Sequence, residues 1–257
     1  MNCVATAHEI EIVSYKNSKA VPGHPVSSKV IVVVRDSLHL STQLHYLLTR
    51  HAIERGHAPD IETLSSLAGL SMEETERGLH SLHEMRGVIL MPGSSTVWSL
   101  HPFAFLPTRF RVTAGQGGWW ANCAWCSLGI AATLATGVTI RTGDGAEGDE
   151  LEFSVAGGTS SRPDLPMHFP YPPARWWDNP YCPCGNILLF SSQDKIDGWC
   201  ARHGRPKGSV LDMATAIGLA QRWFGDYASP EWRRKSPQDA SRIFDELGLD
   251  RAFWKLP

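Results

Sequence analysis

The sequence lacks several features that would identify a class of protein directly. It has 24 Lys and Arg against 26 Asp and Glu, a formal net charge of −2, so no excess positive charge points to nucleic acid or an anionic membrane as partner. The longest apolar run, residues 30–34, is far too short to cross a bilayer. The first 16 residues contain no basic head followed by an apolar run, so no signal peptide is expected. We therefore expect a cytoplasmic protein that binds neither nucleic acid nor membrane.

The sequence is rich in tryptophan and proline and long enough for a substantial core. It has 257 residues with 10 Trp and 17 Pro, and no internal repeat or low-complexity segment is evident. This length accommodates one large domain or two smaller ones. The composition favours a compact mixed fold with long ordered loops over a helical bundle. Two strand-like pieces, residues 10–15 and 29–34, predict an N-terminal extension over residues 1–37.

Residues 38–100 have the pattern of three helices and a hairpin. Leucines at helical spacing predict the first helix, and Asp60 opens a second, short one. Ser71 and Glu74 have the spacing of a capping box ahead of a third helix. Residues 88–91 and 97–100 flank a Pro-Gly-Ser turn. This order predicts a winged helix-turn-helix-like domain.

The third of these helices is acidic, which argues against DNA binding. It carries Glu73, Glu74, Glu76 and Glu84, whereas a surface that reads DNA must neutralise phosphates. We favour a packing or interaction module. A transcription factor with a metal-sensing domain remains a further hypothesis for the whole protein, and only the winged-helix pattern supports it.

Residues 101–257 are predicted to form a mixed α/β catalytic domain with a small sheet, which makes the fold class α+β. Apolar segments predict helices over residues 127–136, 209–223 and 237–247, and strands over residues 138–141, 150–155 and 187–191. Residues 157–180 are rich in Gly, Pro and aromatics without periodicity, so a long ordered loop is expected there.

Five of the six cysteines lie between residues 123 and 200, which suggests a site. One interpretation is structural zinc, bound by Cys123-x2-Cys126 and Cys182-x-Cys184, with Cys200-x2-His203 as an optional further pair. Its weak points are the short spacing of the second pair and a chain too large to need a metal for folding. Simple burial of unreactive thiols is the alternative for Cys3, Cys123 and Cys200.

Thiol chemistry is the other interpretation. Cys126 lies at the start of a predicted apolar helix, where free N–H groups and the helix dipole favour a thiolate. Cys184 precedes a predicted strand, which would hold its side chain in place. Two thiolates in an aromatic pocket suit a soft metal ion or an organometal.

These features resemble the organomercurial (alkylmercury) lyase family, of which the sequence looks like a divergent member. The similarity rests on Ala124-Trp125-Cys126, on Cys184 ahead of Ile187-Leu188-Leu189-Phe190, and on the preceding winged-helix pattern. The resemblance implies protonolysis of a carbon–mercury bond, with mercury bound by Cys126 and Cys184 and a hydrocarbon and Hg(II) as products. It implies no cofactor, an organomercurial or other thiol-reactive ligand as substrate, and small thiols as partners. The alternative is a non-lyase homologue that binds a soft metal or thiol-reactive ligand through the same cysteines.

One position departs from the family pattern. Gly129 stands where the family usually places an aspartate that relays the proton, three residues after the first cysteine. Either another donor serves, among Cys123, Cys182, Asp178 and His168, or the cleavage step is slow or absent. Trp125 is expected to form a wall of the pocket.

Overall fold

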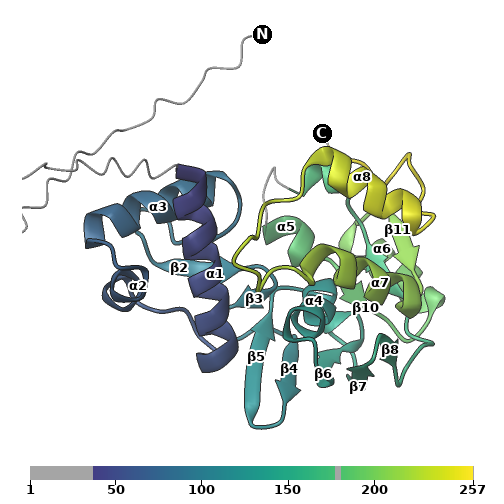
Figure 1. Ribbon diagram of the computed structural model, residues 1–257. Coiled ribbons are helices and arrows are strands. Elements are labelled where there is room, and N and C mark those ends of the chain that lie inside the picture. Colours follow the sequence, from purple (N-terminus) through teal and green to yellow (C-terminus); the bar gives the residue numbers. More distant parts are fainter. Residues whose placement is uncertain (1–36, 177–180, 257) are drawn as a thin grey trace, which may run out of the picture.

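The computed structural model describes residues 37–176 and 181–256, and the side chains within these ranges except at residues 37, 38, 181 and 182. Three helices at the N-terminal end stand beside a larger part in which helices pack on antiparallel sheets (Figure 1). The two strands predicted before residue 37 lie outside the described residues. No helix in the described ranges is long and apolar enough to cross a membrane.

The predicted N-terminal helices are present, and their ends follow the expected caps. They are α1 (Ser37–Arg55), α2 (Ile61–Ala68) and α3 (Met72–Glu84), followed by the hairpin strands β1 (Ile89–Leu90) and β2 (Val97–Leu100). The Asp60 side chain accepts from the Thr63 N–H, and Ser71 and Glu74 form the capping box. Leucines from all three helices form one core with residues of the hairpin.

A residue from the far end of the chain completes this N-terminal core. Trp232 is buried among the leucines and stacks on His45 of α1, with ring centroids 3.5 Å apart. His45 is fully buried, and neither ring nitrogen has a hydrogen-bond partner. Tyr227 meets the edge of the same imidazole. The segment over residues 225–236, which contains Tyr227 and Trp232, therefore ties the two parts of the molecule together.

Burial lowers the pKa of His45 to about 3, which predicts a stability that depends on pH. The unfolded chain binds a proton here below about pH 6.5, while the folded chain binds it only near pH 3. Between these values the free energy of unfolding is expected to fall by about 1.4 kcal/mol per pH unit on acidification. Urea unfolding of wild type and His45→Phe from pH 7 to pH 4 measures this. Phenylalanine keeps the stacking, so parallel curves would contradict a buried neutral His45.

An eight-stranded antiparallel sheet runs through most of the molecule, so the expected small sheet is wrong in size. Its order is β1-β2-β3-β5-β4-β6-β7-β8. The hairpin continues directly into β3 (Phe103–Ala104), so the sheet passes through residue 100 without interruption. The remaining strands are β4 (Arg111–Ala114), β5 (Gly117–Ala121), β6 (Val138–Gly143), β7 (Glu150–Ala156) and β8 (Thr159–Ser160).

A second sheet corrects the prediction of a long loop over residues 157–180. Strand β9 (Met167–Phe169) lies within that segment and is the central strand of a three-stranded sheet, between β10 (Leu188–Leu189) and β11 (Ser209–Leu211). Strand β9 has only three residues, and all of them are buried. It therefore lacks the alternation of apolar and polar residues by which a strand is predicted from sequence. The helix α6 (Gln193–His203) was also not predicted, because only three of its eleven residues are buried.

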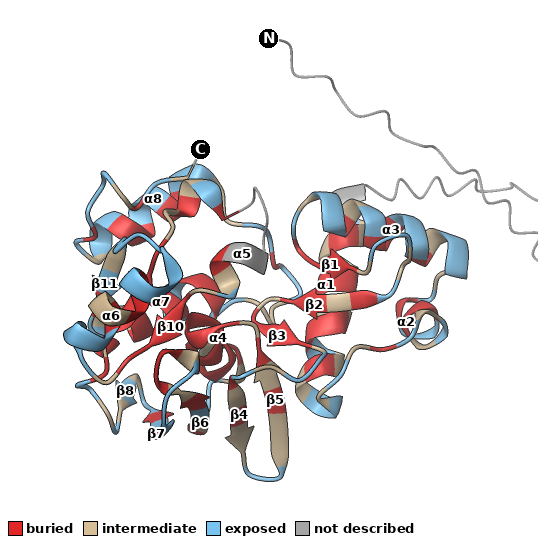
Figure 2. Ribbon diagram, turned by 180° about the vertical axis from the view of Figure 1, so that it is seen from behind, coloured by how far each residue is buried: buried red, intermediate tan, exposed pale blue. Residues whose placement is uncertain are grey.

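Helix α4 (Ala124–Leu134) forms the centre of the larger part. Nine of its eleven residues are buried, and it packs against α7 (Met213–Phe224) (Figure 2). The last helix, α8 (Pro237–Glu246), covers α7 from outside. Short elements complete the chain: η1 (Asp144–Ala146), η2 (Pro173–Arg175) and α5 (Tyr181–Cys184). Helix α4 is apolar on every face, as expected for a helix inside the core.

Candidate functional site

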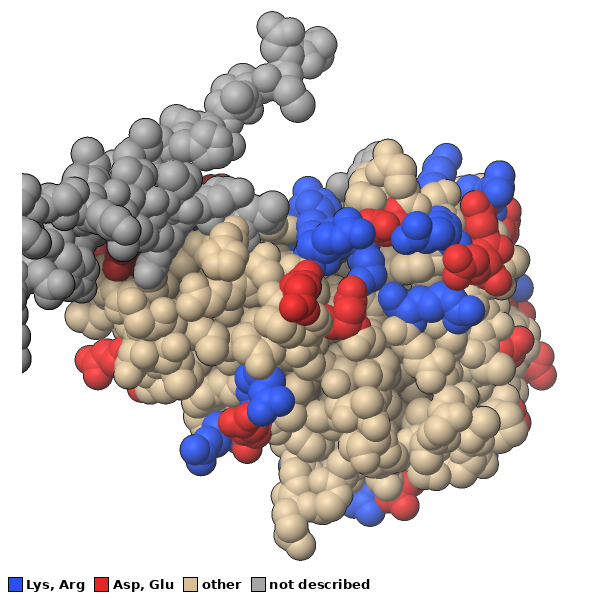
Figure 3. Space-filling view, in the orientation of Figure 1, with Lys and Arg blue, Asp and Glu red and all other residues tan. Residues whose placement is uncertain are grey.

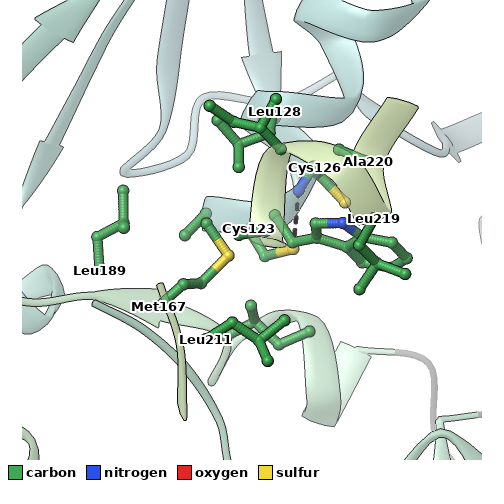
Figure 4. Close-up of a cluster of buried hydrophobic side chains, with 14 of the residues drawn as sticks. Cys123, Cys126, Leu128, Met167, Leu189, Leu211, Leu219 and Ala220 are labelled. Atoms are coloured by element: carbon green, nitrogen blue, oxygen red, sulfur yellow. Dashed lines mark hydrogen bonds between the residues drawn. The ribbon is translucent and has the colours of Figure 1, made fainter. Parts of the chain in front are cut away.

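The first two cysteines of the site are held by the start of α4. Cys123 is the N-cap residue, with extended backbone, and its Sγ accepts from the Cys126 N–H at 3.3 Å (Figure 4). Both side chains are buried. A sulfur in this position occupies the place of the usual oxygen cap. Cys123 therefore fixes the first helical turn, on which Cys126 lies.

Cys184 reaches the same place from a distant segment. It ends the short helix α5, and the Ile187 N–H donates to the Pro183 carbonyl at 3.0 Å just after it. The Ile187 carbonyl then accepts from the Ala124 N–H at 3.1 Å, which joins this turn to the start of α4. Two backbone hydrogen bonds therefore hold Cys184 near Cys126.

His101 completes the group. Its Nε2 lies 3.3 Å from the Cys184 Sγ. The ligand atoms of His101, Cys126 and Cys184 all lie within 4.8 Å of one another, and across residues 37–176 and 181–256 no other set of three His, Cys, Asp or Glu side chains is arranged to hold a metal ion. Two thiols and an imidazole suit soft and borderline metals.

The thiols of Cys123, Cys126 and Cys184 differ in how readily they lose a proton. Burial opposes ionisation of Cys123, but hydrogen bonds from Cys126 and Cys184 and the nearby helix start hold the pKa of Cys123 well below its usual value. Burial and the neighbouring Cys123 raise the pKa of Cys126, and the hydrogen bond with Cys123 does the same for Cys184. Burial lowers the pKa of His101, so its imidazole is neutral at pH 7. Of the three thiols, Cys123 is therefore the one that loses its proton most readily.

The group opens into an aromatic pocket with a cavity of about 60 Å³. The Trp125 ring lies against Trp176, Trp223 and Phe224, with centroids 4.9–5.7 Å apart. The wider lining comes from segments between residues 86 and 256: Arg86, Gly87, His101, Trp125, Cys126, Trp176, Pro183, Cys184, Ile187, Trp223, Phe224, Tyr227, Trp232, Arg234, Lys235 and Leu256. Cys123 and Cys126 are buried and Cys184 is half-buried, so polar interactions among them are stronger than in water.

Gly129 lies one turn after Cys126, and its surroundings leave no room for a side chain. A Cβ there would come within 2.6 Å of Phe224 Cδ2 and 2.9 Å of Pro102 Cβ. Phe224 is itself only 2% exposed, so it has nowhere to move. The aspartate expected from the family resemblance is therefore absent, and the packing of Phe224 occupies its space.

This packing predicts opposite effects of alanine at two helical glycines. Gly129→Ala is expected to lower the free energy of unfolding by about 1–3 kcal/mol through overpacking. Gly198→Ala on α6, where the nearest atom is 3.6 Å away, should raise it by up to about 1 kcal/mol because alanine favours the helix. Urea unfolding of both variants tests this. A Gly129→Ala protein as stable as wild type would show that Phe224 yields easily.

The other residues predicted from the sequence are distributed differently. His168 lies in β9 away from the thiols: its Nε2 is 2.9 Å from the Lys207 carbonyl oxygen and 3.7 Å from the Cys200 Sγ. His203 pairs with Glu147 at 3.1 Å. The structure thus does not bring Cys200 and His203 to the other cysteines as further zinc ligands. Asp178 lies outside the described residues, as does the side chain of Cys182.

Sequence reasoning missed His101 as a site residue. It precedes a proline and the two-residue strand β3, and it is far in sequence from every cysteine. No spacing rule connects it to Cys184, 83 residues away. The antiparallel pairing of β3 with β5, which leads into α4, brings it to the site.

The fold and the group of thiols define a protein suited to bind soft metals through sulfur in an aromatic pocket. The sequence model of the alkylmercury lyase family matches residues 103–225, so this part of the chain is similar to that family. A solved structure, described as the mercury-bound form of MerB2, shares the fold with a TM-score of 0.56 and 16% identity, over 75% of this chain and 99% of that one. A search of curated proteins finds no match.

Proposed function

We propose that this protein is an organomercurial lyase that cleaves carbon–mercury bonds by protonolysis, with Cys126 and Cys184 as the sulfur ligands of mercury. The observation that carries the proposal is the convergence of His101, Cys126 and Cys184 within 4.8 Å. The family match supports the type of reaction. Mercury is here part of the substrate, and no cofactor is required.

The first step is exchange of thiols at mercury. An organomercurial in a cell is bound to a small thiol, because mercury prefers sulfur. The Cys126 sulfur forms a bond to mercury, the bond to the small thiol breaks, and the departing thiolate takes the Cys126 proton. The thiolate at Cys123 next to Cys126 assists, since it accepts a hydrogen bond from that thiol.

The second step delivers the proton to carbon, and His101 is placed to carry it. As the Cys184 sulfur binds mercury, its proton passes to the neutral imidazole 3.3 Å away. The imidazolium then protonates the carbon, whose bond to mercury breaks as the C–H bond forms. The products are the hydrocarbon and Hg(II) held by two thiolates, which small thiols then remove.

The donors suggested by the sequence fit this role less well. Hydrogen bonds from Cys126 and Cys184 lower the pKa of Cys123, so it is the thiol of the three best suited to accept hydrogen bonds as a thiolate. His168 is engaged with Lys207 and Cys200. Asp178 and Cys182 stay predictions.

The size of the cavity favours a small organic group. Its volume of about 60 Å³ is well below the roughly 150 Å³ of an apolar cavity that binds benzene. A methyl or ethyl group therefore fits beside the thiols without movement of the aromatic walls. We expect methylmercury to react faster than phenylmercury.

We assign residues 101–257 as the catalytic domain, 38–100 as a winged-helix-like module and 1–37 as an extension. The module contributes Arg86 and Gly87 to the pocket lining, which supports a role in enclosing the site. Gly87 allows this contact, since a Cβ there would lie 3.0 Å from the Trp232 ring.

The second candidate is a homologue that holds a soft metal without cleaving a bond. The observation in its favour is that glycine, with no acidic side chain, stands at position 129, where the family usually has an aspartate. The two candidates are separated by incubating the protein with methylmercury or phenylmercury and excess small thiol, then measuring hydrocarbon and bound mercury. Hydrocarbon release above the Cys126→Ser background supports the lyase. Tight mercury binding without release supports the metal-binding homologue.

A further inference from the structure

Cys123 and Cys126 form a Cys-x-x-Cys pair at the start of a helix. Cys123 is the N-cap residue of α4, and Cys126 lies on its first turn. Cα atoms three residues apart along a helix are about 5 Å from each other, and disulfides join Cα atoms that are roughly 4.4–6.8 Å apart. The same arrangement occurs in dithiol–disulfide oxidoreductases. The pair therefore has the spacing to close into a disulfide without a large movement of the backbone.

The two thiols are already in contact. The Cys123 Sγ accepts from the Cys126 N–H at 3.3 Å, a hydrogen bond drawn in Figure 4. The Cys126 thiol donates to the same sulfur. Rotation of the two side chains is then enough to bring sulfur to sulfur, because the start of the helix already holds them side by side.

The two thiols differ in their access to the aromatic pocket. Cys126 lines the pocket, whereas Cys123 is not among its described lining residues. The exposed fraction is 1% for Cys126 and 0% for Cys123, so the pocket is the route by which a small molecule reaches the pair. Cys126 is therefore the thiol that an incoming molecule meets first, and Cys123 is the thiol next to it.

The pocket has room for a small oxidant. Its cavity measures about 60 Å³, and one water molecule needs roughly 10–15 Å³ of such space, so hydrogen peroxide fits. Arg86, Arg234 and Lys235 also line the pocket, and both arginines are exposed. Figure 3 shows basic side chains gathered in the upper middle of this face, with acidic ones beside them. An uncharged peroxide passes these mixed charges without being repelled.

We propose that Cys123 and Cys126 are a redox-active dithiol, in which hydrogen peroxide oxidises Cys126 and Cys123 then closes a disulfide with it. The Cys126 sulfur takes one oxygen as the O–O bond breaks, which gives a sulfenic acid and one water. The Cys123 sulfur then bonds to the Cys126 sulfur, the S–O bond breaks, and the oxygen leaves as a second water with the Cys123 proton. The two thiols lose two electrons and two protons, and the peroxide is reduced.

The disulfide keeps the oxidation of Cys126 reversible. A sulfenic acid without a neighbouring thiol is oxidised further to a sulfinic acid, which small thiols do not reduce. The disulfide stops this progression, and excess small thiol restores both cysteines by exchange. Mercury binding then depends on the supply of reduced small thiol, a consequence that rests on the proposed function, whereas the dithiol itself does not.

Peptide mass spectrometry of the full chain tests the dithiol directly. The protein is treated with hydrogen peroxide, alkylated under denaturing conditions and digested with trypsin. Cys123 and Cys126 then lie in one peptide, residues 112–141. Cys184 lies in another, residues 176–195. We expect the first peptide to lose two hydrogens, to resist alkylation at both cysteines, and to regain both thiols after small thiol is added. An unchanged first peptide, or a cross-link between the two peptides, would overturn the inference.

Cys123→Ser removes the second thiol and keeps the helix cap, because serine is a preferred N-cap residue. We expect about tenfold more of this variant than of wild type to reach the sulfinic acid at Cys126, a gain of two oxygens that small thiol does not reverse. Equal amounts in the two proteins would overturn the role of Cys123. Cys200→Ser is the matched control, since the Cys200 sulfur contacts His168 and the Pro206 carbonyl. It should form the disulfide as wild type does.

Preincubation with methylmercury separates this inference from the proposed function. Mercury bound to the Cys126 sulfur should prevent the loss of two hydrogens from the peptide of residues 112–141. Disulfide formation in protein that holds one mercury per chain would overturn Cys126 as a mercury ligand and leave the dithiol intact. A peptide that stays unchanged in mercury-free protein would overturn the dithiol and leave the lyase proposal intact.

Discussion

Replacing Cys126 with serine is expected to reduce hydrocarbon release from methylmercury at least 1000-fold, equivalent to about 4 kcal/mol of transition-state stabilisation. Serine keeps the size and the helix, but its hard oxygen binds mercury weakly. The buried position makes the loss larger, because neither water nor a surface thiol can replace the missing sulfur. Gas chromatography of methane, with excess small thiol present, measures the effect.

Cys200→Ser is the matched control for that variant. Cys200 is also buried, but its sulfur contacts His168 and the Pro206 carbonyl instead of the pocket. Its loss should leave the rate within about twofold of wild type, since no step uses it. Equal losses in the two variants would mean that serine damages folding in both, and the role of Cys126 would then lack support.

Replacing His101 with glutamine is expected to separate binding from cleavage. Both sulfur ligands remain, so one mercury per chain should still bind after a single turnover. Methane formation should fall about 100-fold, within the usual contribution of a positioned acid–base group. Because burial lowers the pKa of His101, the wild-type imidazole is neutral and ready to accept a proton across the neutral range. Methane formation per bound mercury gives the comparison.

The matched control for this variant is His203→Gln on the surface of α6. His203 pairs with Glu147 and does not line the pocket. It should behave as wild type in both binding and cleavage. If His101→Gln instead lost mercury binding and cleavage together, His101 would be a ligand or a structural residue, and the proton would have to come from elsewhere.

Local sequence signals predicted those parts of the fold that depend on neighbours along the chain. Asp60 and Ser71 each cap the helix expected after them, because a side-chain oxygen three residues ahead of a free N–H acts locally. The helix predicted from residue 209 begins only at Met213, because residues 209–211 form β11. The hairpin around residues 89–100 followed from its turn. Strand β9 escaped prediction because its burial comes from β10 and β11 on either side, which no local pattern encodes.

The candidate site was predictable only in part, because contacts between distant segments leave no local pattern in the sequence. Cys126 was identified by its place at a helix start, and Cys184 by its place before a strand. The structure brings these two side chains together, although the assignment of their roles remains a proposal. His101 was missed because only sheet pairing brings it near.

Gly129 shows how packing decides which chemistry is available. Its absence of a side chain is matched by Phe224 and Pro102, which fill the space an acid would need. An aspartate restored here would have to displace a buried ring and bury a carboxylate, so it is expected to destabilise the fold before it could act. The proposed proton delivery therefore comes from another direction, through His101 in the turn before β3, whose Nε2 lies 3.3 Å from the Cys184 Sγ.

The most direct test of the whole account is a single-turnover reaction of wild-type protein with one equivalent of methylmercury. Methane is measured by gas chromatography, in the presence of excess mercaptosuccinate. The account predicts one methane per mercury, and none above background in Cys126→Ser. Mercury bound at one per chain, with no methane above that background, would contradict protonolysis and leave a soft-metal binding protein.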